Sequence, residues 1–132
     1  ILGLFLVFAD DATPDFGPVE VEMGIIEVDD QYELDQVYLE VESSEPGFVV
    51  VYESMGGAPG DELGVSEYFD AGSHEVTIDV APSMIPDYTY ITILHVDNGD
   101  EQFDYRDDHA AMVEDAVVRP SFDARSIESE NE

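Results

Sequence analysis

The feature that most constrains the fold is a series of short runs in which apolar and polar residues alternate. A period of two puts one set of side chains on a buried face and the other in water, which predicts β-strands with one wet face. The run GFVVVYES is continuously β-branched and aromatic, as in a central strand, and Pro120 places the last strand at an edge or bulge. We expect strands at residues 19–23, 36–43, 47–54, 74–81, 87–96 and 114–124.

Turn-forming stretches rich in Gly, Pro and Asp separate these runs. Residues 55–62, MGGAPGDE, are expected to form a flexible hairpin loop, and only residues 107–116, DDHAAMVEDA, suggest a turn or two of helix. Many short strands with such connections predict an all-β fold. We expect an antiparallel β-sandwich, immunoglobulin-like in arrangement, with a β-barrel as the alternative.

The charge balance points to the environment of the protein. There are 33 Asp and Glu against three Arg and Lys, giving a net charge of −30, while a hydrophobic content of 44% supports a folded core. At molar salt the Debye length falls to about 3 Å, and most of the self-repulsion disappears. The acids are spread along the chain, which favours a protein of a halophilic archaeon over a nucleic-acid mimic. Nucleic acid and anionic lipid are excluded as partners because this surface repels both.

Four segments follow one another in a familiar order: GFVVVYES, GDELGVSEYFDAGSHEVTIDV, ITILHVDNGDEQFDY and VEDAVVRPSF. Over residues 47–122 they resemble a domain of unknown function that recurs in secreted and cell-surface proteins of halophilic archaea. The chain departs from the family pattern at Tyr52-Glu53, where His-Asp is usual, and its acidic loop is shorter. The resemblance implies an exported, extracellular β-sandwich at the cell surface and supplies no catalytic mechanism.

The residues that could carry catalysis have simpler structural explanations. The chain contains no Cys, so thiolate chemistry and disulfides are absent from it. Ser66 in GVSEY lacks the second glycine and the helix of a nucleophile elbow. His74, His95 and His109 are too scattered for a zinc site, and His74 and His95 are expected to be structural. We therefore predict that the protein is not an enzyme.

One acidic loop has the composition of a cation site. Asp97, Asp100 and Asp104, with Asn98 and Glu101 as further candidates, place hard oxygen ligands on a loop that contains a glycine. Calcium prefers such ligands, although the spacing is not that of an EF-hand. The sequence thus predicts a calcium site here, and a plain acidic hairpin turn is the alternative. No other cofactor is predicted.

The first nine residues, ILGLFLVFA, are apolar on both faces of any strand they form. As a helix they would rise about 13.5 Å, less than half of the roughly 30 Å hydrocarbon core of a membrane. As a strand they would extend about 30 Å, and burial of the large side chains is worth on the order of 10–20 kcal/mol. The large apolar residues are Ile1, Leu2, Leu4, Phe5, Leu6, Val7 and Phe8.

This segment leads to the functional hypothesis. We expect residues 1–9 to be a donor strand, residues 10–18 a linker, residues 19–125 the β-sandwich and residues 126–132 an acidic tail. Donation of the strand to a neighbouring copy would give a head-to-tail homopolymer, an extracellular filament or pilus without direct membrane insertion in its assembled form. The alternative is a monomeric cell-surface binding module, with or without calcium, in which residues 1–9 form its own first strand or an anchor remnant. A secreted hydrolase is a third, weaker hypothesis.

Overall fold

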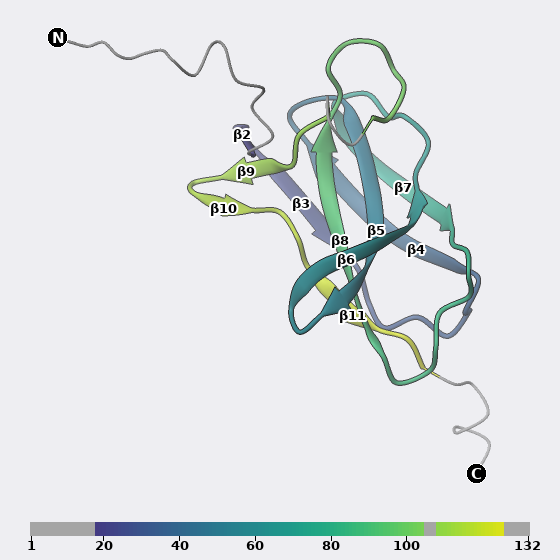
Figure 1. The fold of residues 1–132 in the computed structure, drawn as a ribbon. Coiled ribbons are helices and arrows are strands. Elements are labelled where there is room, and N and C mark those ends of the chain that lie inside the picture. Colours follow the sequence, from purple (N-terminus) through teal and green to yellow (C-terminus); the bar gives the residue numbers. More distant parts are fainter. Residues whose placement is uncertain (1–17, 105–107, 126–132) are drawn as a thin grey trace, which may run out of the picture.

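The computed structural model describes residues 18–104 and 108–125, which contain ten strands and no helix (Figure 1). The predicted donor strand, most of the predicted linker and the predicted acidic tail lie outside the described residues, and the proposed domain boundaries stay predictions. The strands are β2 (Val19–Glu20), β3 (Gly24–Glu27), β4 (Gln36–Ser43), β5 (Gly47–Met55), β6 (Ala58–Val65), β7 (Gly72–Asp79), β8 (Thr89–Val96), β9 (Ala111–Val113), β10 (Ala116–Val117) and β11 (Ser121–Asp123).

The described strands form three sheets. A four-stranded sheet has the order β11-β8-β5-β6, a three-stranded sheet has the order β3-β4-β7, and a small third sheet joins β10, β9 and β2. All neighbours are antiparallel except β2 and β9. The all-β prediction is confirmed, and the immunoglobulin-like arrangement stays a prediction.

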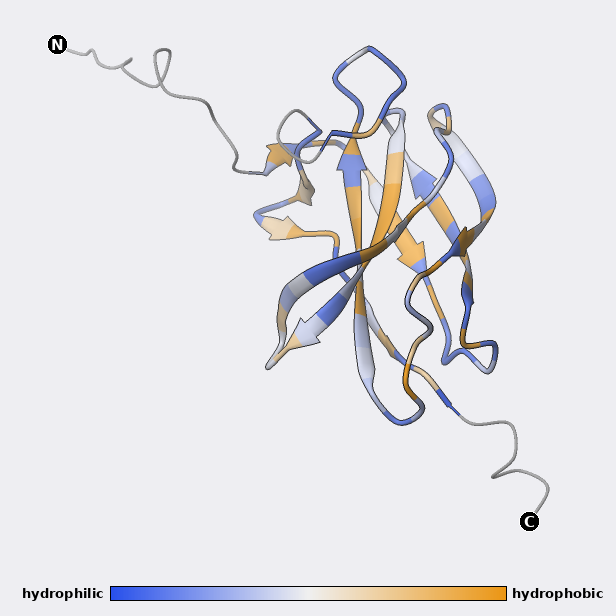
Figure 2. Ribbon diagram, turned by 45° about the vertical axis from the view of Figure 1, so that its right-hand side comes forward, coloured by the Kyte–Doolittle hydropathy of each residue, from blue (hydrophilic) through white to orange (hydrophobic). Residues whose placement is uncertain are grey.

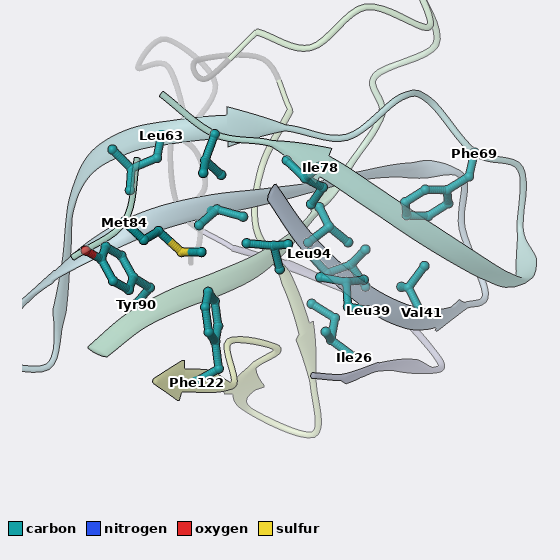
Figure 3. Close-up of a cluster of buried hydrophobic side chains, with 14 of the residues drawn as sticks. Ile26, Leu39, Val41, Leu63, Phe69, Ile78, Met84, Tyr90, Leu94 and Phe122 are labelled. Carbon is teal, nitrogen blue, oxygen red and sulfur yellow. The ribbon is translucent and has the colours of Figure 1, made fainter. Parts of the chain in front are cut away.

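The two larger sheets enclose the main hydrophobic core. Leu39 of β4 and Ile78 of β7 are fully buried with Leu94 of β8 (Figure 3). Each such side chain contributes roughly 1.5–3 kcal/mol when it is removed from water. In Figure 2 the hydrophobic colour lies mainly on the strands, and most of the loops are hydrophilic.

A second apolar cluster lies on the other face of β5 and β8. It contains Val50, Tyr52, Ile91 and Ile93, and partly buried residues such as Phe103 pack against it. The first six residues of β5 are therefore buried on both faces. This confirms the prediction of a central strand at 47–54.

Three local predictions were wrong. The single strand expected at 114–124 is divided into β10 and β11, which belong to different sheets. Where a turn or two of helix was expected at 107–116, residues 111–116 instead belong to the β9–β10 hairpin, whose turn holds Glu114 and Asp115 at positive φ, 50° and 73°. The expected flexible loop at 55–62 is mostly strand β6, which pairs with β5 after a turn at Gly56 and Gly57. Both glycines have positive φ, 66° and 99°, which a two-residue hairpin turn requires.

Gln31 joins the two larger sheets beyond the end of β3. Its side-chain amide donates to the carbonyl oxygens of Asp29 and Tyr38, at 2.8 and 3.0 Å, and accepts from the Tyr38 N–H at 2.9 Å. Its backbone N–H donates to the Asp123 carbonyl at 2.9 Å, and its own carbonyl accepts from the Arg125 N–H at 2.8 Å. One residue thus replaces a missing stretch of β3–β4 pairing and connects it to β11.

Candidate functional site

The acidic loop after β8 brings three carboxylates together. Candidate ligand oxygens of Asp97, Asp100 and Asp108 all lie within 4.8 Å of one another. Asp97 is partly buried, Asp100 is exposed and Asp108 is completely buried. Three carboxylates at this separation have the oxygen chemistry that a calcium ion prefers.

Asp108 organises the loop from its centre. Its carboxylate accepts hydrogen bonds from the backbone N–H groups of Asn98, at 2.9 Å, and Asp104, at 2.6 Å. The Asp97 carboxylate accepts similar bonds from Gly99 and Glu101. These bonds satisfy backbone donors in a segment that belongs to no strand.

Burial raises the pKa of the Asp108 carboxyl, and the negative charges of Asp97 and Asp100 raise it further. The two backbone hydrogen bonds act in the opposite direction because they stabilise the carboxylate. The ionised form of Asp108 is therefore destabilised by burial and by its acidic neighbours, and a bound cation would offset this unfavourable free energy.

Beneath this loop lies a buried hydrogen-bonded chain. His95 Nδ1 lies 2.7 Å from the Asp108 carbonyl oxygen, and His95 Nε2 lies 2.9 Å from the Tyr52 hydroxyl. Because Nδ1 must donate to the carbonyl, a neutral ring accepts the Tyr52 O–H at Nε2. Phe103 packs edge-on against the imidazole, with ring centroids 5.2 Å apart.

Burial lowers the pKa of His95, and the charge of nearby His109 lowers it further, against the opposing effect of the Asp108 carbonyl. The imidazole is therefore held neutral inside the fold. Its two ring nitrogens each have a partner within hydrogen-bond distance. This agrees with the prediction that His95 is structural.

A pocket of about 470 Å³ opens beside this chain. Tyr52, His95 and Ile93 contribute to its lining, together with Pro59 on β6 and Val117 on β10. The polar groups of Tyr52 and His95 bond to each other at this surface. The pocket therefore presents a hydrogen-bonded pair between apolar side chains and the acidic residues Asp61 and Glu62.

The structure also places the other sequence candidates. Asp104 contributes its backbone N–H to the Asp108 carboxylate, and the carboxylate cluster contains Asp108 where the sequence suggested Asp104. Ser66 is buried and its hydroxyl accepts the Val49 N–H at 2.9 Å. His74 lies within β7, and its Nε2 is 2.7 Å from the Asp70 carbonyl oxygen.

Sequence reasoning missed Asp108, because only the fold brings it to the loop after β8. The isolated bridge between His95 and Ala110 brings the segment that follows Asp108 back onto β8. Asp97 is the first acidic residue after His95, and Asp108 is the first acidic residue before Ala110, so the bridge brings the two close together. The spacing along the chain alone could not reveal this, because it depends on the register of the return.

Residues 24–124 match the family described as Domain of unknown function (DUF7282). The chain belongs to this family. It is 34% identical over 118 residues to Cell surface glycoprotein 1 of Haloarcula hispanica, and 34% identical over 95 residues to Cell surface glycoprotein 2 of the same organism. These alignments cover 85% and 68% of the chain but only 12% and 10% of the two relatives. No solved structure matches the chain.

The comparisons confirm the resemblance drawn from the sequence and extend it beyond residues 47–122. Both relatives are cell surface glycoproteins of a halophilic archaeon, which confirms the predicted cell-surface location of this DUF7282 domain. Among the described residues, no helix combines the length and apolar character needed to cross a membrane.

His95 gives the domain a predicted sensitivity to acid. Its lowered pKa means that the unfolded chain binds a proton more readily than the fold does. The corresponding stability is fully present above the ordinary His pKa of 6.5 and is lost as the pH falls below it. Urea unfolding on either side of this pH should give a smaller free energy of unfolding at the lower pH.

His95→Gln should reduce this acid-induced loss, and His74→Gln is the matched control that should retain it. Asp108 acts in the opposite direction, since its raised pKa means that protonation favours the folded state. An acid-induced loss of the same size in the His95→Gln variant would show that another group is responsible.

The predicted calcium site is tested by isothermal titration of EDTA-treated protein in molar NaCl. Calcium is expected to bind, and Asp100→Asn should weaken that binding by at least about tenfold because it removes one charged ligand. Asp115→Asn, in the β9–β10 turn, makes the same change outside the cluster and should leave binding unaltered. Equal calcium heats for both variants, or none for the unmodified protein, would contradict the prediction.

Proposed function

We propose that this domain is a non-enzymatic structural module of the haloarchaeal cell surface. The observation that carries the proposal is its similarity to a small part of two cell surface glycoproteins, 12% and 10% of their lengths. Such proportions suit one module of a longer surface protein. In support, the polar groups most suited to chemistry, His95, Ser66 and Asp108, hold the backbone in place.

We further propose that copies of the domain assemble through residues 1–8. Large apolar side chains on such an acidic protein need an apolar partner, and an extended strand can supply backbone hydrogen bonds as well. Donation to the next copy is a head-to-tail contact, which continues into a filament unless the rotation closes a ring. The remaining surface stays acidic and hydrated in salt.

Removal of residues 1–9 tests this assembly. The full chain in molar NaCl should form elongated particles in negatively stained electron micrographs, whereas the truncated chain should give isolated domains. A circular dichroism spectrum of β-type for the truncated chain is the control for folding. Filaments formed by the truncated protein would contradict assembly through residues 1–8.

A monomeric surface-binding module is the second candidate. The cluster of Asp97, Asp100 and Asp108 favours it, since a bound cation would stiffen a loop suited to recognition. The two candidates differ in particle size: a module remains a single domain in molar salt with or without calcium. Calcium-dependent binding of this single domain to isolated cell envelopes would support the module.

A further inference from the structure

The outer edge of β7 has the properties of a strand acceptor. β7 pairs with β4 over all eight of its residues, Gly72–Asp79, in a continuous register without a bulge. It is the last strand of its sheet, and no described strand or bridge pairs with its other side. A long and regular free edge of this kind is a template for another strand.

A groove runs along this edge. It has a volume of about 220 Å³ and lies between β7 and the segment at residues 67–69. Phe69 is buried in the main core, and half-buried Val76 packs against that core from β7. The ring of His74 lies beside Phe69, with centroids 5.4 Å apart. The groove is mostly polar, because Glu67 and Glu75 also line it and Phe69 is only 6% exposed. Half-buried Val76 is the aliphatic side chain that the groove offers beside the free backbone edge.

The other edges are less suitable. The outer edge of β6 is interrupted by Pro59 and is partly occupied, because the Leu63 carbonyl accepts the Ala81 N–H at 3.0 Å. The edge beside β11 is closed by Gln31, which pairs with Asp123 and Arg125. β3 is only four residues long. Among the described strands, β7 presents the longest uninterrupted edge.

The position of β7 favours a strand from another copy. In Figure 1 the chain enters the described domain beside β2 and β9, and β7 lies on the opposite side of the molecule. Residues 1–8 are a run of apolar side chains that can lie alongside the eight residues of β7. With Leu2, Leu4, Leu6 and Phe8 on one face, it can turn its continuous apolar row toward Val76 and Phe69. The opposite row contains Gly3 and is the less apolar of the two.

We propose that residues 1–8 of one copy add to the free edge of β7 in the next copy and fill the groove beside Phe69 and Val76. This inference rests on the proposed assembly and names its acceptor. The donated segment carries no charged side chain, so it brings no further carboxylate to the interface between the two copies. The described chain begins at β2, on the side of the domain away from β7, and a strand passed from there to the β7 edge of another copy is a head-to-tail contact that can propagate.

Disulfide trapping between two preparations of the full chain tests the acceptor. The protein has no native Cys, so each engineered thiol is unique. Phe5→Cys lies on the outward row of the donor, and Ser73→Cys, Glu75→Cys and Thr77→Cys sample successive positions on the exposed face of β7. Glu27→Cys is the matched control, because Glu27 and Glu75 flank Glu40 on opposite edges of the same sheet.

Each β7 variant, and the control, is mixed with an affinity-tagged Phe5→Cys protein and oxidised in molar NaCl. At least one β7 variant should give a disulfide-linked pair of two copies in several-fold higher yield than Glu27→Cys, because neighbouring strands bring the Cβ atoms within disulfide range. Amide hydrogen exchange should also slow along β7 when the full chain assembles.

Three other outcomes overturn the inference, and they separate it from the proposed function. If filaments form but the disulfide yield at Glu27→Cys equals that at the β7 positions, β7 is not the acceptor. The proposed assembly then still stands. The second outcome concerns a single protein that carries both Phe5→Cys and the β7 substitution. If its disulfide forms within one copy, the apolar segment folds back onto its own domain and is not donated to another copy. Absence of assemblies from the unmodified chain removes the proposed assembly and the acceptor together.

Discussion

The domain is expected to unfold when the salt concentration falls from molar to about 10 mM, because the Debye length then rises from about 3 Å to about 30 Å. With a net charge of −30, the carboxylates then repel one another across the whole surface. Circular dichroism during thermal unfolding at a series of NaCl concentrations measures this. A melting temperature that does not depend on salt would contradict the account of the acidic surface.

One part of that repulsion is visible in the strand register. Glu40 of β4 lies directly opposite Glu27 of β3 on one side and Glu75 of β7 on the other, and all three are exposed. Like charges facing each other across strands destabilise a sheet by roughly 0.2–1 kcal/mol a pair. Glu40→Gln should therefore raise the free energy of unfolding by about 0.4–2 kcal/mol at low salt and by less at molar salt.

Glu33→Gln is the control for this substitution, since it removes the same charge from an exposed loop outside the row. It should raise low-salt stability less than Glu40→Gln does. Equal effects of the two substitutions would mean that only the total charge matters, and that the carboxylate row has no special role.

Replacement of Gln31 by Ala is expected to lower the free energy of unfolding by about 2–4 kcal/mol. It removes three side-chain hydrogen bonds and leaves the N–H and C=O of Tyr38 without the partners that continue the sheet. Gln31 is 9% exposed, so water replaces these bonds poorly. Urea unfolding in molar NaCl measures the loss.

Gln36→Ala is the matched control, because it removes the same atoms from a side chain for which the described residues supply no hydrogen bond. Its effect should stay below about 1 kcal/mol. If Gln31→Ala were no more destabilising than Gln36→Ala, the connection between the two sheets would have to depend on the backbone bonds of residue 31 alone.

The long strands could be predicted because their side chains carry a strong signal. β4 alternates Val37, Leu39 and Val41 with exposed residues, and its observed burial follows the same alternation. β5 and β8 are rich in β-branched and aromatic residues, and their central residues are buried on two faces by the separate core clusters. In these segments the local pattern and the tertiary environment agree.

The missed elements depend on contacts between distant residues. β6 begins with Ala58, Pro59 and Gly60, which have low strand propensity, and it is a strand because the Gly56-Gly57 turn directs it back along β5. β9 and β10 come from a segment whose Ala and Met residues favour helix. Pairing with β2 and the positive-φ turn at Glu114 and Asp115 override that preference.

The candidate site was predicted in part for the same reason. Asp97 and Asp100 share one loop, so their proximity follows from the sequence alone. Asp108 joins them only because the chain returns to pair with His95, and its role depends on burial that no local pattern reveals. The partners of His95 and Gln31 likewise come from segments far along the chain.

Sedimentation velocity of the full chain and of the chain lacking residues 1–9, both in molar NaCl, tests the central claim most directly. The account predicts a broad distribution of large, concentration-dependent species for the full chain and a single domain-sized species for the truncated one. A full chain that sediments as a single domain at every concentration would contradict it.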